Sequence, residues 1–146
     1  MPTDPYLSCN FLIEISGESI AAFQECSAIK VKIDVVEYRE GGSVLSHKLP
    51  GKVSYDPIVL KWGVGDEVNM DFLYEWHKNA ANGTIDRRDG AIIQLGHDKV
   101  STVMRWEFKN AWPSGFETGL FKAGDASATA IETLTLVCER IERVRV

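Results

Sequence analysis

Residues that could carry catalytic or metal-binding chemistry occur in this sequence, but none has the spacing that such chemistry requires. His47, His77 and His97 are scattered, with no pair at the spacing that metal-binding histidines use. The charge cluster at 86–89 (Asp-Arg-Arg-Asp) is typical of a solvated turn or of a salt-bridged contact with another subunit. The glycines at 63 and 65 lack the third glycine of a dinucleotide-binding loop. We therefore predict no enzyme activity, no cofactor and no metal site.

Composition excludes further classes of protein. The chain has 146 residues, 45% of them hydrophobic, which is enough for the core of one domain over 1–146. A net charge of -5 argues against a sequence-independent nucleic-acid binder, which presents a basic face to the phosphates. Cys9, Cys26 and Cys138 are odd in number and lack a Cys-x-x-Cys pair, so we predict neither a disulfide framework nor a zinc site.

The sequence shows no sign of targeting to a membrane. No apolar run approaches the roughly 18 residues that a membrane-spanning helix needs. Residues 1–5 do not have the basic patch and apolar run of a signal peptide. We expect synthesis in the cytosol and no membrane insertion.

The most informative stretch is a polar segment at 39–51, between two segments that have strand patterns, 29–38 and 53–62. A hairpin inside one domain normally closes with a loop of about two to five residues, so a longer one needs a reason. Contact with another chain is one reason, and a flexible solvent-exposed loop is the alternative. The residues assigned to this contact are Arg39, Glu40, Gly41, Gly42, Ser43, Lys48, Leu49, Pro50 and Gly51.

The remaining pattern is mainly β, with one helix. Alternating apolar residues predict strands at 9–15, 29–38, 104–109 and 131–143. β-Branched and aromatic content predicts a strand at 53–62, an apolar run predicts one at 91–95, and glycine, serine and alanine predict a loop at 113–128. Pro57 cannot donate to a ladder and predicts an edge or a bulge. Apolar residues at helical spacing predict a helix over 66–80, capped by Asp66 and buried through Phe72 and Trp76.

Seven segments together resemble the tail-tube proteins of contractile phage tails and of related bacterial injection systems. These segments are 11–15, 22–27, 38–43, 47–51, 58–63, 106–113 and 130–134. They span almost the whole chain in the family's order, and the specificity lies in that succession. The resemblance implies a β-sandwich-like barrel with one flanking helix. It also implies rings of six copies that stack into a tube with a continuous β-barrel lumen.

The function implied by the resemblance is structural. The tube would be a rigid conduit that a contracting sheath drives through a target envelope, carrying DNA or protein cargo. Its partners would be further copies of itself, a sheath protein, a baseplate hub or spike, and a tube terminator. Assembly would be cytoplasmic, into a phage tail or a tail-like particle. Candidate lumen-facing residues are Lys30, Lys32, Asp34, Arg105, Glu107, Lys109, Thr133, Thr135 and Glu139.

Several alternatives stay open at this point. A monomeric β-barrel that binds a small molecule would also show alternating strands and one helix, but with short hairpins and an apolar interior. The tube protein of type VI secretion shares the architecture. These residues do not separate a phage tail from a bacterial injection system, or a main tube subunit from one that starts the tube on the baseplate.

Overall fold

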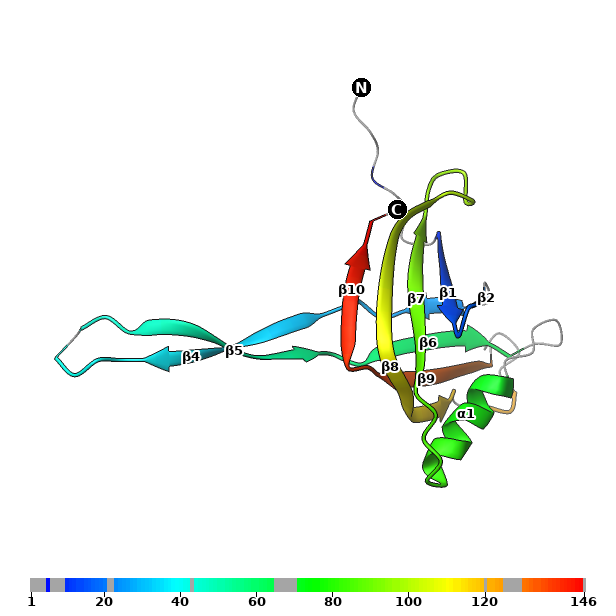
Figure 1. The fold of residues 1–146 in the computed structure, drawn as a ribbon. Coiled ribbons are helices and arrows are strands. Elements are labelled where there is room, and N and C mark those ends of the chain that lie inside the picture. The colour runs from blue at the N-terminus through cyan, green and yellow to red at the C-terminus, as the bar shows by residue number, and fades with distance from the viewer. Residues whose placement is uncertain are drawn as a thin grey trace.

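Two layers of strands, one helix and a projecting hairpin make up the computed structural model (Figure 1). It describes residues 5, 10–20, 23–42, 44–64, 71–119, 121–124 and 130–145, without the side chain of Ile20. The strands are β1 (Phe11–Ile15), β2 (Glu18–Ile20), β3 (Phe23–Cys26), β4 (Val31–Tyr38), β5 (His47–Tyr55), β6 (Ile58–Gly63), β7 (Arg88–Leu95), β8 (Thr102–Thr118), β9 (Ile131–Val137) and β10 (Arg140–Val144). The helix is α1 (Asp71–Ala81).

Strand β8 belongs to both layers. The strands are hydrogen-bonded in the order β2-β1-β7-β8-β9-β6-β3, and β10 also pairs with β8. The first half of β8 pairs with β7 and β10, and its second half pairs with β9. We call β2-β1-β7-β8-β10 the first layer and β8-β9-β6-β3 the second layer. In Figure 1 the strands of the two layers run across one another.

The bend of β8 lies at Asn110, which has a left-handed backbone with φ of 53°. Asparagine tolerates this conformation better than most residues. The carboxylate of Asp89 accepts a hydrogen bond from the Asn110 amide at 2.9 Å, and the Asn110 side chain donates to Glu139 at 2.8 Å. The predicted strand 131–143 is therefore wrong as a single strand. It breaks at 138–139, because its first part follows one half of β8 and its second part the other.

The core lies between the two layers. The period of two turns alternate side chains of the strands in these layers toward it. Buried residues from both layers form one cluster: Ile13, Ile15, Ile92, Phe108 and Ile141 from the first, and Phe23, Ile58, Leu60, Trp62, Leu134 and Leu136 from the second. Gly90 is required there, since a Cβ at this position would lie 2.4 Å from the Phe108 ring. The strands predicted at 91–95 and 104–109 are confirmed as parts of β7 and β8.

Helix α1 packs on the sandwich beside β8. Trp76 is 2% exposed, and its indole nitrogen donates to the carbonyl of Asp86 at 2.6 Å. The prediction that Trp76 is buried is confirmed, but the prediction that Phe72 is buried is wrong. Phe72 is 36% exposed, and Leu73, three residues before Trp76 on the same helix face, is buried instead. The predicted start of the helix at Asp66 lies outside the described residues.

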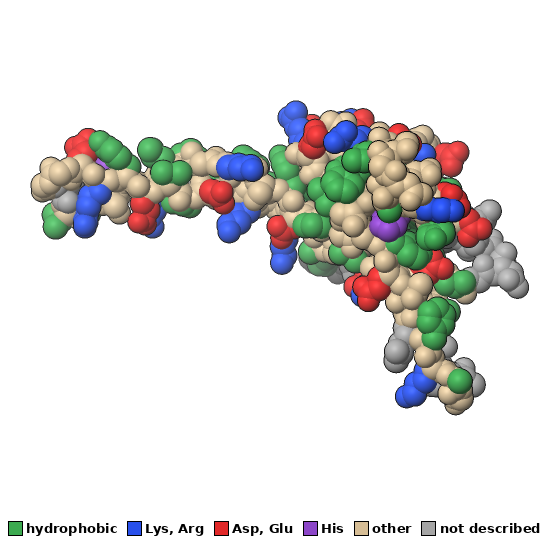
Figure 2. Space-filling model, turned by 90° about the horizontal axis from the view of Figure 1, so that it is seen from below, with side chains coloured by type: hydrophobic (Ala, Val, Ile, Leu, Met, Phe, Trp, Pro, Cys, Tyr) green, Lys and Arg blue, Asp and Glu red, His purple; other side chains and the backbone are tan. Residues whose placement is uncertain are grey.

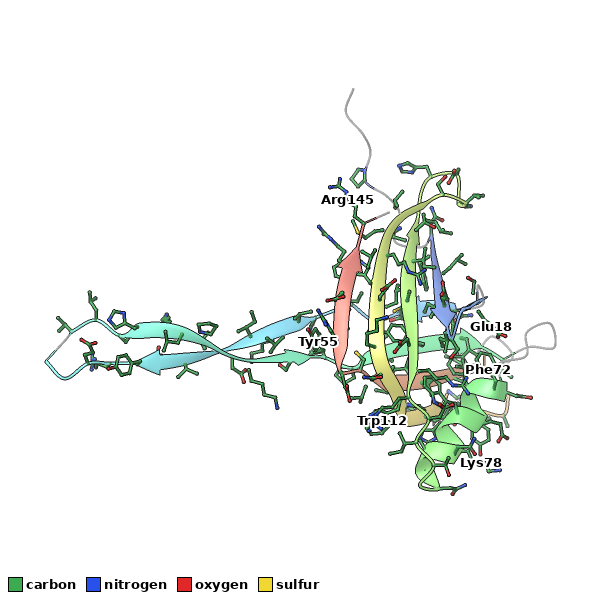
Figure 3. All side chains as sticks on the ribbon, viewed as in Figure 1. Glu18, Tyr55, Phe72, Lys78, Trp112 and Arg145 are labelled. Atoms are coloured by element: carbon green, nitrogen blue, oxygen red, sulfur yellow. The ribbon has the colours of Figure 1, made fainter. Side chains whose placement is uncertain are left out.

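Two other boundaries differ from the sequence prediction. Residues 113–118, expected in a loop, continue β8 and pair with β9, while 120 and 125–129 lie outside the described residues. The expected strand 53–62 is interrupted by Asp56 and Pro57, which separate β5 from β6. Proline lacks the amide hydrogen that would continue the ladder. This interruption lies where the hairpin leaves the body, close to the labelled Tyr55 in Figure 3.

Candidate functional site

The hairpin β4–β5 is a separate two-stranded sheet that extends away from the body (Figure 1). Its strands pair from Val31 opposite Tyr55 to Tyr38 opposite His47. The unpaired loop is therefore 39–46, and the predicted loop 39–51 is too long. Pro50 is accommodated in β5 because both strands of an isolated hairpin are edges, where the missing donor costs little.

Apolar side chains cover the hairpin although every described residue of β4 is exposed. Figure 2 shows them interleaved with charged side chains along its length. A two-stranded hairpin alone is at best marginally stable in water. The apolar residues of β4 and β5 that are at least 44% exposed are Val31, Ile33, Val35, Val36, Tyr38, Leu49 and Val53. Strand β4 projects beyond the body, so its apolar face does not pack on the helix (Figure 1).

Apolar side chains lie on both faces of the hairpin, because Val35 and Val36 are adjacent on β4 and a bulge in β5 changes the face of its apolar residues. Residues directly opposite each other share a face in an antiparallel pair. Near the body, Ile33 lies opposite Val53, and the register then shifts between Ile33 and Val35. Farther out, Val36 lies opposite Leu49 on the other face of β4. The hairpin therefore presents two apolar patches that point in different directions.

The tip carries the first group of residues assigned from sequence to an intersubunit contact. Gly42 has φ of 85°, which favours glycine, and a side-chain nitrogen of Arg39 donates to the Val44 carbonyl at 3.4 Å. Ser43 lies outside the described residues. Lys48, Leu49, Pro50 and Gly51 lie instead on β5. A Cβ at Gly51 would lie 3.1 Å from the Asp34 carbonyl oxygen, so a larger residue at this point of the bulge would be tightly packed.

The candidate lumen residues are distributed over three surfaces of the subunit. Lys32 and Asp34 lie on the hairpin, with Lys30 immediately before it. Arg105, Glu107 and Lys109 share the outer face of the first layer. Thr133 and Thr135 lie on the outer face of the second layer, since Leu134 and Leu136 point into the core. Glu139 lies between β9 and β10. Their position relative to a lumen stays a prediction.

The outer face of the first layer carries a network of ion pairs centred on Arg105. Its guanidinium binds both carboxylate oxygens of Glu14, at 2.9 and 3.2 Å, and Glu107 at 3.0 Å. Lys109 lies 3.7 Å from Asp89 and 4.0 Å from Glu107. The hydrogen bond from Arg105 lowers the pKa of Glu14, and its two carboxylate partners raise the pKa of Arg105. Every acid in this network has a basic partner, so it holds β1, β7 and β8 together and is not a reactive centre.

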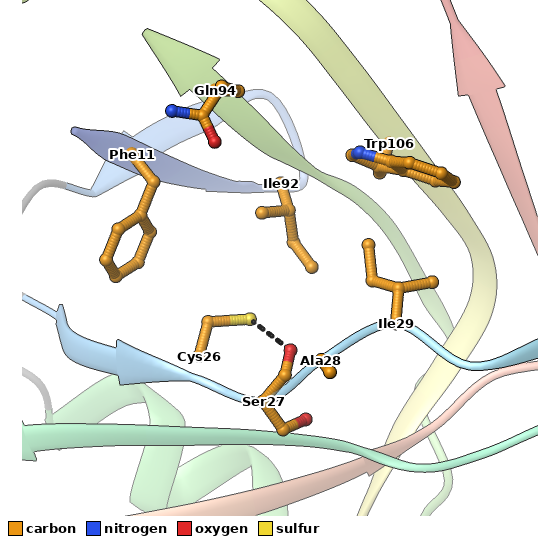
Figure 4. Close-up of a pocket in the computed structure, with 8 residues that line it drawn as sticks. All are labelled: Phe11, Cys26, Ser27, Ala28, Ile29, Ile92, Gln94 and Trp106. Atoms are coloured by element: carbon orange, nitrogen blue, oxygen red, sulfur yellow. Dashed lines mark hydrogen bonds between the residues drawn. The ribbon is translucent and has the colours of Figure 1, made fainter. Parts of the chain in front are cut away.

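An apolar cleft opens between the two layers beside the root of the hairpin (Figure 4). It has a volume of about 350 Å³. Its lining residues are Phe11, Cys26, Ser27, Ala28, Ile29, Ile92, Gln94 and Trp106. Burial, with a smaller contribution from Glu25, raises the pKa of the Cys26 thiol to about 11, which makes it a poor nucleophile.

Among the described residues, no group of three or more His, Cys, Asp or Glu residues is placed to hold a metal ion. Within the described ranges, no helix has the length and apolarity needed to cross a membrane. The distinctive feature that remains is a two-layered β-sandwich with a long hairpin whose apolar side chains it does not cover. Such a subunit is suited to association with other chains.

The sequence analysis did not single out the apolar side chains of the hairpin as a candidate surface. The alternation of Val31, Ile33 and Val35 with polar residues is equally typical of a strand with one face on a core. The signal that could have identified them is the adjacent pair Val35 and Val36, which puts apolar side chains on both faces of one strand. A strand with one face on a core and one in water needs apolar side chains on one face only.

Comparison with known proteins places the chain in a family. Residues 7–142 match the model of the family described as T4-like virus tail tube protein gp19. The chain belongs to this tail tube family. No curated protein sequence gave a significant match.

Solved structures of low sequence identity share its fold. A chain in an extracellular contractile injection system, the PVC sheath-tube complex in its extended state, is 24% identical with a TM-score of 0.84, over 97% of this chain and 93% of that one. A chain in the six-fold symmetrised baseplate of the anti-feeding prophage (AFP) is 24% identical with a TM-score of 0.83, over 99% and 98%. Hcp1 from Flavobacterium johnsoniae is 14% identical with a TM-score of 0.54, over 93% and 95%. The fold is therefore more similar to these two injection-system chains than to Hcp1.

Proposed function

We propose that this tail tube protein is the structural subunit of the inner tube of a contractile injection system or a phage tail. Six copies form a ring, and rings stack into a conduit that carries cargo protein or DNA. The observation that supports this best is the exposed apolar hairpin in a chain of this family. Closure of a ring also covers strand edges that would otherwise invite uncontrolled association.

The hairpin is the inter-ring connector in this proposal. It carries the described residues that were assigned from sequence to the subunit contact, and its two apolar patches suit two different neighbouring surfaces. A contact between two different surfaces propagates without end unless another protein terminates it. The partners proposed are therefore other copies, a surrounding sheath protein, a baseplate hub below and a terminator above.

A shortened hairpin tests this connector. Replacing residues 37–48 by Asn-Gly joins Val36 to Leu49, which already pair, by a two-residue turn. The variant should unfold at the same temperature as the wild type and form rings, but electron microscopy should show no stacked tubes. Tubes of normal length from the shortened variant would contradict the proposal. Arg39→Glu should weaken stacking in a salt-dependent way, since exposed ion pairs are screened by salt.

The lumen is proposed to be lined by part of the polar surfaces described above. Charges of mixed sign would keep a charged cargo from adhering, because six-fold repetition multiplies a field of one sign. Cysteine in place of Lys32 or Thr135 tests two of the three surfaces separately. A bulky thiol reagent should label lumen positions slowly in intact tubes and rapidly in dissociated subunits. A position that reacts equally fast in both states lies outside the lumen.

A further inference from the structure

The end of the hairpin and the cleft between the layers are two apolar surfaces that one subunit does not bring together. The cleft includes Ile29, just before β4 begins, so it lies beside the root of the hairpin. The eight residues of β4 extend about 26 Å from there at about 3.3 Å per residue. Figure 1 shows that the hairpin is directed away from the body along this whole length. Its end therefore does not reach its own cleft.

We propose, on the basis of the tube function above, that the hairpin end of one subunit docks in the cleft of a second copy. The docking residues are Val36, Tyr38, Val44 and Leu49. The cleft supplies Phe11, Ile29, Ile92 and Trp106 (Figure 4). These cleft residues form the surface that receives the hairpin end of a neighbouring copy.

Size and polarity match between the two surfaces. The cleft volume of about 350 Å³ lies at the lower end of the range for sites that enclose a small ligand, which is room for a few side chains. Val44 is 89% exposed and Tyr38 and Leu49 are each 50% exposed, so the hairpin end has unburied apolar groups to fill it. Association that buries both surfaces removes apolar area from water on each side.

Charges of both signs occur at the border of the cleft and at the hairpin end, where Arg39 and Lys48 are basic, and opposite charges can pair between the two surfaces. Lys30 follows Ile29 and is exposed, and the Arg143 guanidinium lies over the Trp106 ring at 5.8 Å. The exposed acid Glu40 lies at the hairpin tip, four residues from Val44. Docking of the end would bring Glu40 toward these two cations. In this inference Lys30 contacts the hairpin of a neighbouring copy and is no longer a candidate lumen-facing residue.

The geometry of such a contact suits a stack. The donor surface is the far end of the hairpin and the receptor lies at its root, so one copy can donate to one neighbour and receive from another. When donor and receptor belong to different neighbours, such a contact propagates into closed rings or open stacks. The second copy is therefore the occupant that the chain itself supports.

Photo-crosslinking tests the assignment directly. A benzophenone amino acid is placed at Val44, and at Val100 as a control, because Val100 is 79% exposed on the β7–β8 turn. Each variant is mixed with ¹⁵N-labelled wild type, assembled, irradiated and digested, so that intersubunit adducts are identified by mass. Adducts from position 44 should map to labelled peptides containing Ile29 or Trp106, and those from position 100 should not.

The outcomes separate this inference from the function on which it rests. Tubes with position-44 adducts on α1 or on the outer face of the first layer overturn the docking site and leave the tube function intact. The absence of any ring or tube in the electron micrographs of wild type contradicts both.

A charge exchange provides a second, independent measurement. Glu40→Lys and Lys30→Glu should each reduce tube yield about tenfold at low salt, since like charges would face each other across the contact. The double variant restores the opposite pair and should recover most of the yield. A double variant as defective as the single ones would count against the proposed contact.

Discussion

The body and the hairpin of this chain use the same residue types with opposite results. In the body, Ile13, Leu134 and Leu136 are fully buried between two layers. In the hairpin, Val31, Ile33 and Val36 are half exposed, although they lie on a strand with a regular ladder. The difference is not in β-propensity but in whether a second layer covers the strand. The hairpin thus carries apolar side chains that the isolated subunit leaves exposed.

Removal of a large side chain from the body should have the largest effect on stability. Trp76→Ala should lower the free energy of unfolding by about 3–5 kcal/mol, through lost burial and a cavity. The matched change in the hairpin, Tyr38→Ala, should alter it by no more than about 0.5 kcal/mol. Chemical denaturation of the free subunits measures both. Equal losses from the two variants would remove the distinction between body and hairpin.

Addition of a single methyl group should have a smaller effect that depends equally on the region. Gly90→Ala should cost about 1–3 kcal/mol, since its Cβ would lie 2.4 Å from both the Phe108 ring and the Glu14 carbonyl oxygen. Gly41→Ala in the hairpin has open space around the Cβ and should be close to neutral. Thermal unfolding distinguishes them. A stable Gly90→Ala protein would show that β1 and β8 can move enough to make room for the added methyl group.

The ion pairs on the body should give the smallest effect, visible through its pH dependence. Glu14→Gln should cost about 0.5–1 kcal/mol at neutral pH, as expected of a partly exposed pair. The pKa of Glu14 is lowered in the folded state from a reference of 4.5. Its contribution is therefore complete above pH 4.5 and is lost as the pH falls through the lower folded value. Thermal unfolding from pH 7 to pH 3 should show wild type and variant converging, and a constant difference would contradict this role.

The sequence predicted the body better than the hairpin for a physical reason. A period of two, as in Met104, Trp106 and Phe108, follows directly from the pleat of a strand that has one face on a core. The helix was recognised from its stripe, but the stripe includes two adjacent apolar residues, and Leu73 is buried where Phe72 was expected. Gly115 and Pro113 suggested a loop where β8 in fact continues.

The sequence predicted a segment outside the core at 39–51, and whether this segment makes an intersubunit contact stays a prediction. The described residues of 39–51 lie on the projecting hairpin, because polar and glycine-rich composition marks a segment outside the core. Their pairing was missed because Pro50 and Gly51 are ordinary signals of a turn, and only the register of the partner strand shows that they form a bulge. Alternation indicates that a face is buried, but it does not indicate whether the same chain or another one buries it.

The strand β8 has a mechanical consequence. Sliding one layer of a sandwich past the other ordinarily breaks only side-chain contacts, which resist shear weakly one at a time. Here the 17 residues of β8 run through both layers without interruption. A shear force between the layers is therefore carried in part by the covalent backbone near Asn110, and not by side-chain contacts alone.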